Sequence, residues 1–135
     1  LCEHAGTLGV NLLLEQMNRS ETNYFHKISE ISEYIRTTGI PNLKAHPDTF
    51  HMNIEEKDQF SPIVRNSDVI GYIHFSDNNR LIPGYGHIDF RAVLTALKLI
   101  EYDGWIGIEF VPKSDVSREA EMALAYIKTL LELDI

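Results

Sequence analysis

The chain has 135 residues, of which 44% are hydrophobic, as is usual for one globular domain. Its 20 acidic side chains outnumber its 12 basic ones, and the net charge of −8 repels nucleic-acid phosphates because the few bases are scattered. Every apolar run is too short to cross a bilayer. We therefore expect no nucleic-acid partner and no membrane segment.

The start of the chain, "LCEHAGTLGV", lacks the basic and apolar regions of a secretory signal. The single cysteine, Cys2, cannot form an internal disulfide and favours a reducing compartment, so we expect a cytoplasmic protein. Because an initiator methionine is missing too, we expect the chain to be part of something longer.

Four short β-rich runs alternate with amphipathic helical stretches, the pattern of parallel strands joined by helical crossovers. The first predicted strand, 10–14, follows Gly9, which caps the tail of an earlier helix. The helix after it ends at Gly39 and has an apolar face made of Tyr24, Ile28, Ile31 and Ile35. The second strand is 43–45, and its helix lies within 58–66, where Pro62 is tolerated near the first turn.

The third predicted strand, 70–75, leads into a long polar loop, "SDNNRLIPGYGHI", and then into a helix. That helix ends before Gly104, and its apolar face is Phe90, Val93, Leu94, Leu97 and Ile100. The fourth strand is 106–110. The last helix, 117–133, has an inward stripe of Ala120, Ala123, Leu124, Ile127, Leu130 and Leu131. We place no domain boundary within residues 1–135.

One metal-capable residue stands at or just beyond the end of each predicted strand. These residues are Glu15, Asp48, His74 and Glu109. Alone, each of them is more often a solvated loop residue or a capping partner. Because parallel α/β folds bring the carboxyl ends of their strands to one face, we expect the four to converge.

Three carboxylates and one imidazole held together would raise one another's pKa values unless a cation neutralised them. We therefore expect one divalent ion. Ligands dominated by oxygen, with one nitrogen, suit Mn²⁺, Mg²⁺ or Co²⁺ better than a tetrahedral structural zinc.

Further histidines surround Asp48 in "HPDTFHMNIEE". His51 lies three residues beyond Asp48 and is expected near the metal as a substrate contact. His46 precedes a proline and is expected mainly to end the strand. His4, His26 and His87 are interpreted as surface or capping residues.

Four stretches, "LLLEQMNRSET", "DTFHMNIEE", "HFSDNNRLIPGYGHIDF" and "YDGWIGIE", resemble successive motifs of the xylose-isomerase-like sugar isomerases and epimerases. The resemblance is strongest to the ketose 3-epimerases. It implies an α/β fold that is the C-terminal half of a (β/α)₈ TIM barrel, with four parallel βα units forming strands five to eight. The family's four metal ligands fall on Glu15, Asp48, His74 and Glu109.

The resemblance also places the substrate contacts on Glu21, His51 and Arg80, and implies Glu15 and Glu109 as the two catalytic bases. The activity it implies is C3 epimerisation of a ketose sugar through a cis-enediolate, with Mn²⁺ as the expected ion. The chain has "SDNNR" where the epimerases more often have "GEANR", and His46 where many have an apolar residue.

Other functions stay open at the level of sequence. An aldose–ketose isomerase or an inosose dehydratase could use the same metal cradle, and half a barrel could be a non-catalytic module that binds metal or sugar. A DNA-repair nuclease of related fold needs several metals and a basic face, and the charge of −8 argues against this function. The unpaired edges of a half barrel favour self-association, so we expect a homo-oligomer.

Overall fold

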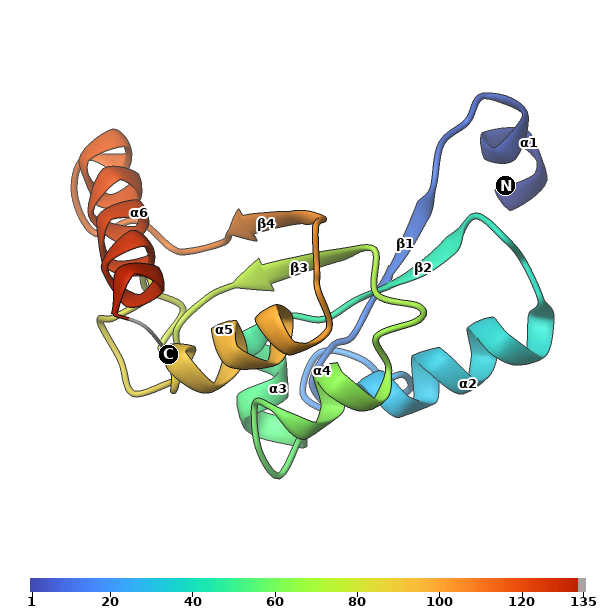
Figure 1. The fold of residues 1–135 in the computed structure, drawn as a ribbon, viewed down its shortest axis with the longest axis horizontal. Helices are drawn as coiled ribbons and strands as arrows, with labels where there is room; N and C mark the ends of the chain where they lie inside the picture. The colour runs from blue at the N-terminus through green and yellow to red at the C-terminus, as the bar shows by residue number, and fades with distance from the viewer. Residues whose placement is uncertain (134–135) are drawn as a thin grey trace.

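The structure is a computed structural model that describes residues 1–133. Its elements in chain order are α1 (Cys2–Thr7), β1 (Leu12–Glu15), α2 (Ile28–Thr38), β2 (Leu43–His46), α3 (Thr49–Glu55), α4 (Ser61–Arg65), β3 (Tyr72–Phe75), α5 (Phe90–Leu99), β4 (Trp105–Ile108) and α6 (Val116–Glu132). Helices α2, α4 and α5 lie along one side of the strands, while α1 and α6 lie at opposite ends of the molecule (Figure 1).

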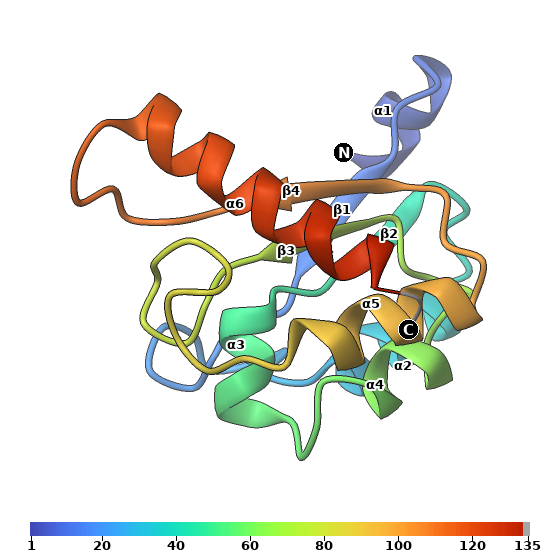
Figure 2. The same cartoon turned by 60° about the vertical axis from the view of Figure 1, so that its left-hand side comes forward.

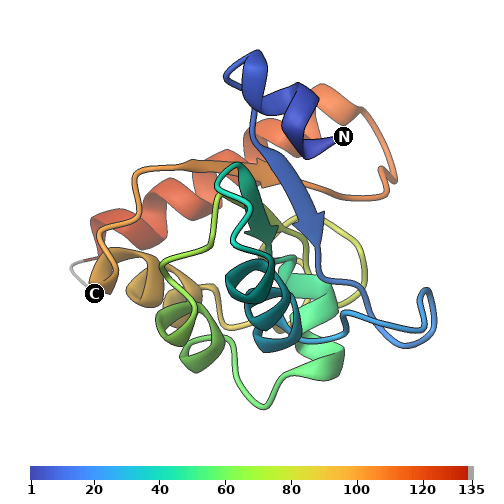
Figure 3. The same cartoon turned by 90° about the vertical axis from the view of Figure 1, so that its right-hand side faces the viewer.

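The four strands are parallel neighbours in the order in which the chain forms them. β1 pairs with β2, and β3 pairs with β4. Two isolated parallel bridges connect this half of the layer to β3. Ala45 in β2 pairs with Ile70 just before β3, and Asp48 just after β2 pairs with His74 in β3. Figure 3, viewed from the end that carries α1, shows β1 and β2 running in the same direction. Because all four run one way, their carboxyl ends lie at the same edge.

Two hydrophobic clusters fix the helices against this layer. The larger cluster joins β3 to α5 and α6 and includes Ile73, Phe75, Phe90 and Ile127. The smaller cluster joins α2 to the β1–β2 pair, where Ile31 and Ile35 pack with Leu43 and Ala45. Figure 2 shows α3, α4 and α5 gathered below β3 and β4. The apolar spacing that predicts α2 and α5 is therefore the spacing of the buried side chains.

The predicted strands and principal helices are present, with shifted ends. The predicted 58–66 helix is the short α4, and its proline does stand in the first turn. Tyr24 was wrongly assigned to the second helix, because α2 begins at Ile28 and the Tyr24 side chain is exposed. Leu124 and Leu131 were wrongly assigned to the inward stripe of α6: both are exposed, since the neighbours of α6 cover only one narrow side.

Helix α3 was not predicted as an element. It begins because Asp48, in an extended conformation, accepts a hydrogen bond from the backbone N–H of Phe50 and so caps the first turn. The Thr49 hydroxyl then donates to the Ser76 carbonyl oxygen at 2.7 Å and accepts from the Ser76 N–H at 2.9 Å. These two bonds hold the start of α3 against the end of β3.

The remaining strand surface is unusually apolar for an exposed one. Trp105 at the start of β4 is 81% exposed, and Leu13 and Ile106 are also exposed. Within residues 1–133, no helix combines the length and the apolar character needed to cross a membrane.

Candidate metal centre

The four predicted ligands converge at the carboxyl edge of the strands. Glu15 ends β1, Asp48 follows β2, His74 lies in β3, and Glu109 follows β4. Each offers one ligand atom, and these four atoms lie within 4.8 Å of one another. The backbone explains the convergence: the His74 N–H donates to the Pro47 carbonyl oxygen, and the Glu109 N–H donates to that of Phe75.

His74 lies close to two of the carboxylates. Its Nδ1 atom is 3.3 Å from Glu15 Oε1 and 3.5 Å from Glu109 Oε2. This nitrogen is buried, yet the angles at these contacts give it no hydrogen-bond partner. A metal ion could use the unshared lone pair and the carboxylate oxygens together, so the donor set fits a cation such as Mn²⁺, Mg²⁺ or Co²⁺.

The pKa shifts of the site residues arise from burial and from neighbouring groups. Asp48 is fully buried, and loss of solvent raises its pKa to about 7 although Arg80 opposes the shift. The adjacent Glu15 carboxylate raises the pKa of His74 against the effect of burial. For Glu15, burial raises the pKa, but His74 and the other histidines outweigh it, and the net shift is downward.

Arg80 supplies the positive charge that balances the carboxylates in this structure. Its Nη1 donates to Asp48 Oδ2 at 2.7 Å and also to Glu109 Oε2. Its guanidinium carbon lies 4.1 Å from the centre of the Phe50 ring. The residue expected to bind substrate therefore bridges two of the expected metal ligands.

The other two expected substrate contacts, His51 and Glu21, are linked through Asn18. The Asn18 side-chain nitrogen lies 2.9 Å from His51 Nδ1 and donates to Glu21 Oε1 at 2.7 Å. His51 is 1% exposed, and burial, aided by Arg80, lowers its pKa. All three predicted substrate residues thus border the carboxylate cluster, with Glu21 at its exposed rim.

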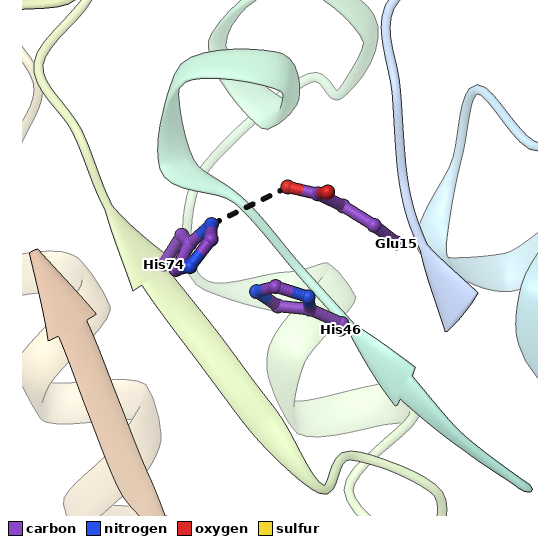
Figure 4. Close-up of side chains that lie close together, drawn as sticks. All are labelled: Glu15, His46 and His74. Atoms are coloured by element: carbon purple, nitrogen blue, oxygen red, sulfur yellow. Dashed lines mark ion pairs between the residues drawn. The ribbon is translucent and has the colours of Figure 1, made fainter. Parts of the chain in front are cut away.

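His46 lies closer to the centre than predicted. Its ring packs edge-on against His74 with centroids 4.2 Å apart, and Figure 4 shows it beside Glu15 and His74. Burial, followed by the nearby His74, lowers its pKa to about 4. Glu15, His46 and His74 form a second group whose ligand atoms lie within 4.8 Å, and His46 Nε2 is buried without a partner. Its position at the end of β2, two residues before Asp48 and so on the same side of an extended chain, is the sequence signal that could have placed it here.

An ion pair that the sequence does not predict, between Arg19 and Glu55, anchors the loop after β1. Glu55 in α3 accepts hydrogen bonds from the Arg19 backbone N–H at 2.7 Å and from its guanidinium at 2.6 Å. The Glu55 side chain is buried, and Arg19 lowers its pKa to about 2. This pair holds the segment that carries Asn18 and Glu21 over α3. The spacing of Arg19 and Glu55 gives no periodic signal in the sequence.

The loop after β3, which carries Arg80, is organised by one buried carboxylate. Asp77 accepts from the N–H groups of Asn78, Gly84, Gly86 and Ile88 at 2.8 to 3.2 Å. A Cβ atom at Gly86 would collide with this carboxylate, so glycine permits the close approach. Arg80 itself has a φ of 60°, in the left-handed region that side chains rarely adopt. The loop therefore holds Arg80 in a strained conformation beside Asp48.

Comparison with known proteins follows from this geometry. The sequence model of the xylose isomerase-like TIM barrel family matches residues 1–130. The chain belongs to this family. It is 36% identical over 130 residues to a ketose 3-epimerase from Arthrobacter globiformis, a match that covers 96% of the chain and 45% of that relative.

Two solved structures of family members superimpose closely. A D-allulose 3-epimerase from Methylomonas sp. gives a TM-score of 0.91 at 31% identity, covering 96% of the chain and 51% of that protein. An L-ribulose 3-epimerase gives 0.92 at 34% identity, covering 97% and 50%. The chain thus spans about half the length of these relatives. The family match and the superpositions confirm a TIM-barrel family fold and the predicted resemblance to the epimerases.

Replacing Asp77 by Asn keeps its shape but turns an NH₂ group toward two backbone N–H donors in either orientation. We expect this to lower the free energy of unfolding by about 1 to 3 kcal/mol, the usual cost of unpaired buried polar groups. Urea unfolding of the intact protein measures it. Asp103→Asn, at an exposed position, is the matched control. Equal stability of Asp77→Asn and the native protein would show that the two N–H groups facing the new NH₂ find other partners.

Proposed function

We propose that the chain contributes the metal-binding half of a ketose 3-epimerase. The observation that carries this proposal is the convergence of Glu15, Asp48, His74 and Glu109, one from each parallel strand, in a chain whose relatives are 3-epimerases. Its substrate is a small ketose sugar. The charge of −8 and the acidic centre favour a neutral sugar over a phosphorylated one.

In this proposal the four βα units are strands five to eight of a (β/α)₈ barrel. Four parallel strands in sequential order, with α2, α4 and α5 on one side of them, support it. So does the exposed apolar strand surface around Leu13, Trp105 and Ile106, because the matching half of a barrel would cover part of it. Uncovered, the same surface favours association between copies.

The four converging residues would hold one divalent ion, with Mn²⁺ as the proposed occupant. When bound, the ion supplies a positive charge at the sugar's carbonyl and neighbouring hydroxyl oxygens, which lowers the pKa of the adjacent C–H and stabilises a cis-enediolate. The two oxygens of the Asp48 carboxylate have different roles. Oδ1 caps α3, and Oδ2 accepts from Arg80 at the centre.

Glu15 and Glu109 would act as the two bases. They come from the first and last strands, and both lie close to His74 Nδ1, at 3.3 Å and 3.5 Å. One would remove the C3 proton from one face of the sugar, and the other would return a proton to the opposite face. Acid–base catalysis by a placed carboxylate contributes typically 10²- to 10⁴-fold.

Arg80, His51 and Glu21 would hold the sugar's oxygens during this exchange. Both carboxylate bonds of Arg80 come from Nη1, so this nitrogen would have to release one of them before it could donate to a sugar oxygen. Its bond to Glu109 also blocks a lone pair that a base needs. Binding of sugar and movement of Arg80 are therefore expected to go together.

Replacing His74 by Ala removes the single nitrogen ligand of the proposed centre. We expect the Mn²⁺ affinity, measured by calorimetric titration of the dialysed protein, to fall at least tenfold. His4→Ala, an exposed histidine in α1, is the matched control. Unchanged affinity in His74→Ala would remove this residue from the metal centre.

Glu15→Gln and Glu109→Gln each remove one base with little change of shape, so net epimerisation should collapse in both variants. The surviving glutamate still exchanges a proton on its own face. With saturating Mn²⁺ and bound metal verified, each variant should wash deuterium from D₂O into C3 of only one epimer, and the two should select opposite epimers. Exchange into the same epimer by both variants would contradict the two-base mechanism and favour an isomerase or dehydratase.

A further inference from the structure

The His51 ring meets hydrogen-bond donors at both nitrogens. At Nδ1, the Asn18 backbone N–H donates at 3.1 Å and the Asn18 side-chain nitrogen lies at 2.9 Å. At Nε2, the Arg80 Nη2 lies at 3.0 Å. A neutral imidazole has one N–H and one lone pair, so only one of these two sides can be a true hydrogen bond.

The Asn18 backbone N–H makes Nδ1 the accepting side, and the orientation of the Asn18 amide agrees with it. Asn18 Oδ1 accepts from the Ser20 N–H at 2.9 Å, and Nδ2 donates to Glu21 Oε1 at 2.7 Å. Turning the amide over would set its oxygen against the Glu21 carboxylate and its nitrogen against the Ser20 N–H. The amide nitrogen therefore faces His51, and two donors from Asn18 converge on Nδ1.

We infer that Asn18 is a positioning residue that fixes His51 as the tautomer with its proton on Nε2. Nδ1 must accept, so the hydrogen lies on Nε2. Arg80 cannot accept it because a guanidinium has no free lone pair. The nearest carboxylate oxygen, Asp48 Oδ2, is 3.8 Å away, beyond hydrogen-bond distance. Among residues 1–133, the Nε2–H is thus a donor held at the centre with no acceptor within hydrogen-bond distance.

A donor in this position recognises an oxygen. His51 would donate to a carbonyl or hydroxyl oxygen of the sugar in the space next to Arg80, an assignment that rests on the proposed function. The donation would strengthen as negative charge develops on that oxygen, so it would contribute more to kcat than to KM. The tautomer itself depends only on Asn18 and His51.

The Arg19–Glu55 pair also fixes the loop that carries Asn18. Because Glu55 binds both the backbone N–H and the guanidinium of Arg19, it fixes the residue next to Asn18 to the helix that carries His51. The donor pair on Nδ1 is therefore held from two sides, by the loop and by α3. A loop free to move would allow either tautomer.

The test reads the tautomer of His51 directly, by ¹⁵N-histidine NMR of the intact, metal-free protein at mildly alkaline pH. We expect an unprotonated Nδ1 and a protonated Nε2 in the native protein. Asn18→Ala should keep this tautomer through the backbone N–H. Asn18→Asp sets a carboxylate oxygen against Nδ1 and should draw a proton onto it. Asn53→Asp, at an exposed position of α3, is the matched control and should change nothing.

Kinetics with Mn²⁺ and a ketose complete the test. We expect Asn18→Asp to lose about 10- to 100-fold in kcat, as is typical when the orienting partner of a site histidine is removed, with a smaller change in KM. A native His51 protonated on Nδ1, or an unchanged His51 spectrum in folded Asn18→Asp, would overturn the inference. Inactivity of the native protein toward every ketose would contradict the proposed function and leave the NMR result standing.

Discussion

The close approach of three carboxylates, one of them fully buried, at one edge of a parallel sheet is the constraint on which the site depends. Glu15, Asp48 and Glu109 are brought together by strand pairing rather than by attraction, and burial raises the pKa of Asp48 to about 7. In this structure Arg80 supplies the balancing charge. In the proposed function a divalent ion would supply more of it, which would link metal binding to the release of Arg80 from a carboxylate.

This balance of charge explains why buried hydrogen-bonded carboxylates hold the surrounding loops. Asp77 holds the Arg80 loop with four backbone hydrogen bonds, and Glu55 holds the opposite loop through Arg19. Both carboxylates are buried, as is His51. The charge of Arg80 is therefore surrounded by groups with little freedom, so the exchange of partners in the proposed function would not disturb the strands.

The convergence of the four metal-capable residues could be predicted from sequence because strand ends in a parallel sheet share an edge, a rule that tolerates shifts of one or two residues at each strand end. Helix α3 could not, since its start depends on Asp48 as a cap and on contacts between Thr49 and Ser76. His46 was underrated because the proline after it suggested only a strand end. The bonds from Asn18 to His51 join residues 33 positions apart and leave no periodic trace.

Anomalous scattering from crystals of the intact protein grown with Mn²⁺ tests the central claim most directly, since it locates the ion independently of activity. The account predicts one strong peak at the manganese edge, within bonding distance of Glu15, Asp48, His74 and Glu109, with Arg80 detached from at least one carboxylate. A crystal with no peak there and Arg80 still bridging Asp48 and Glu109, or a peak that His74 does not contact, would contradict it.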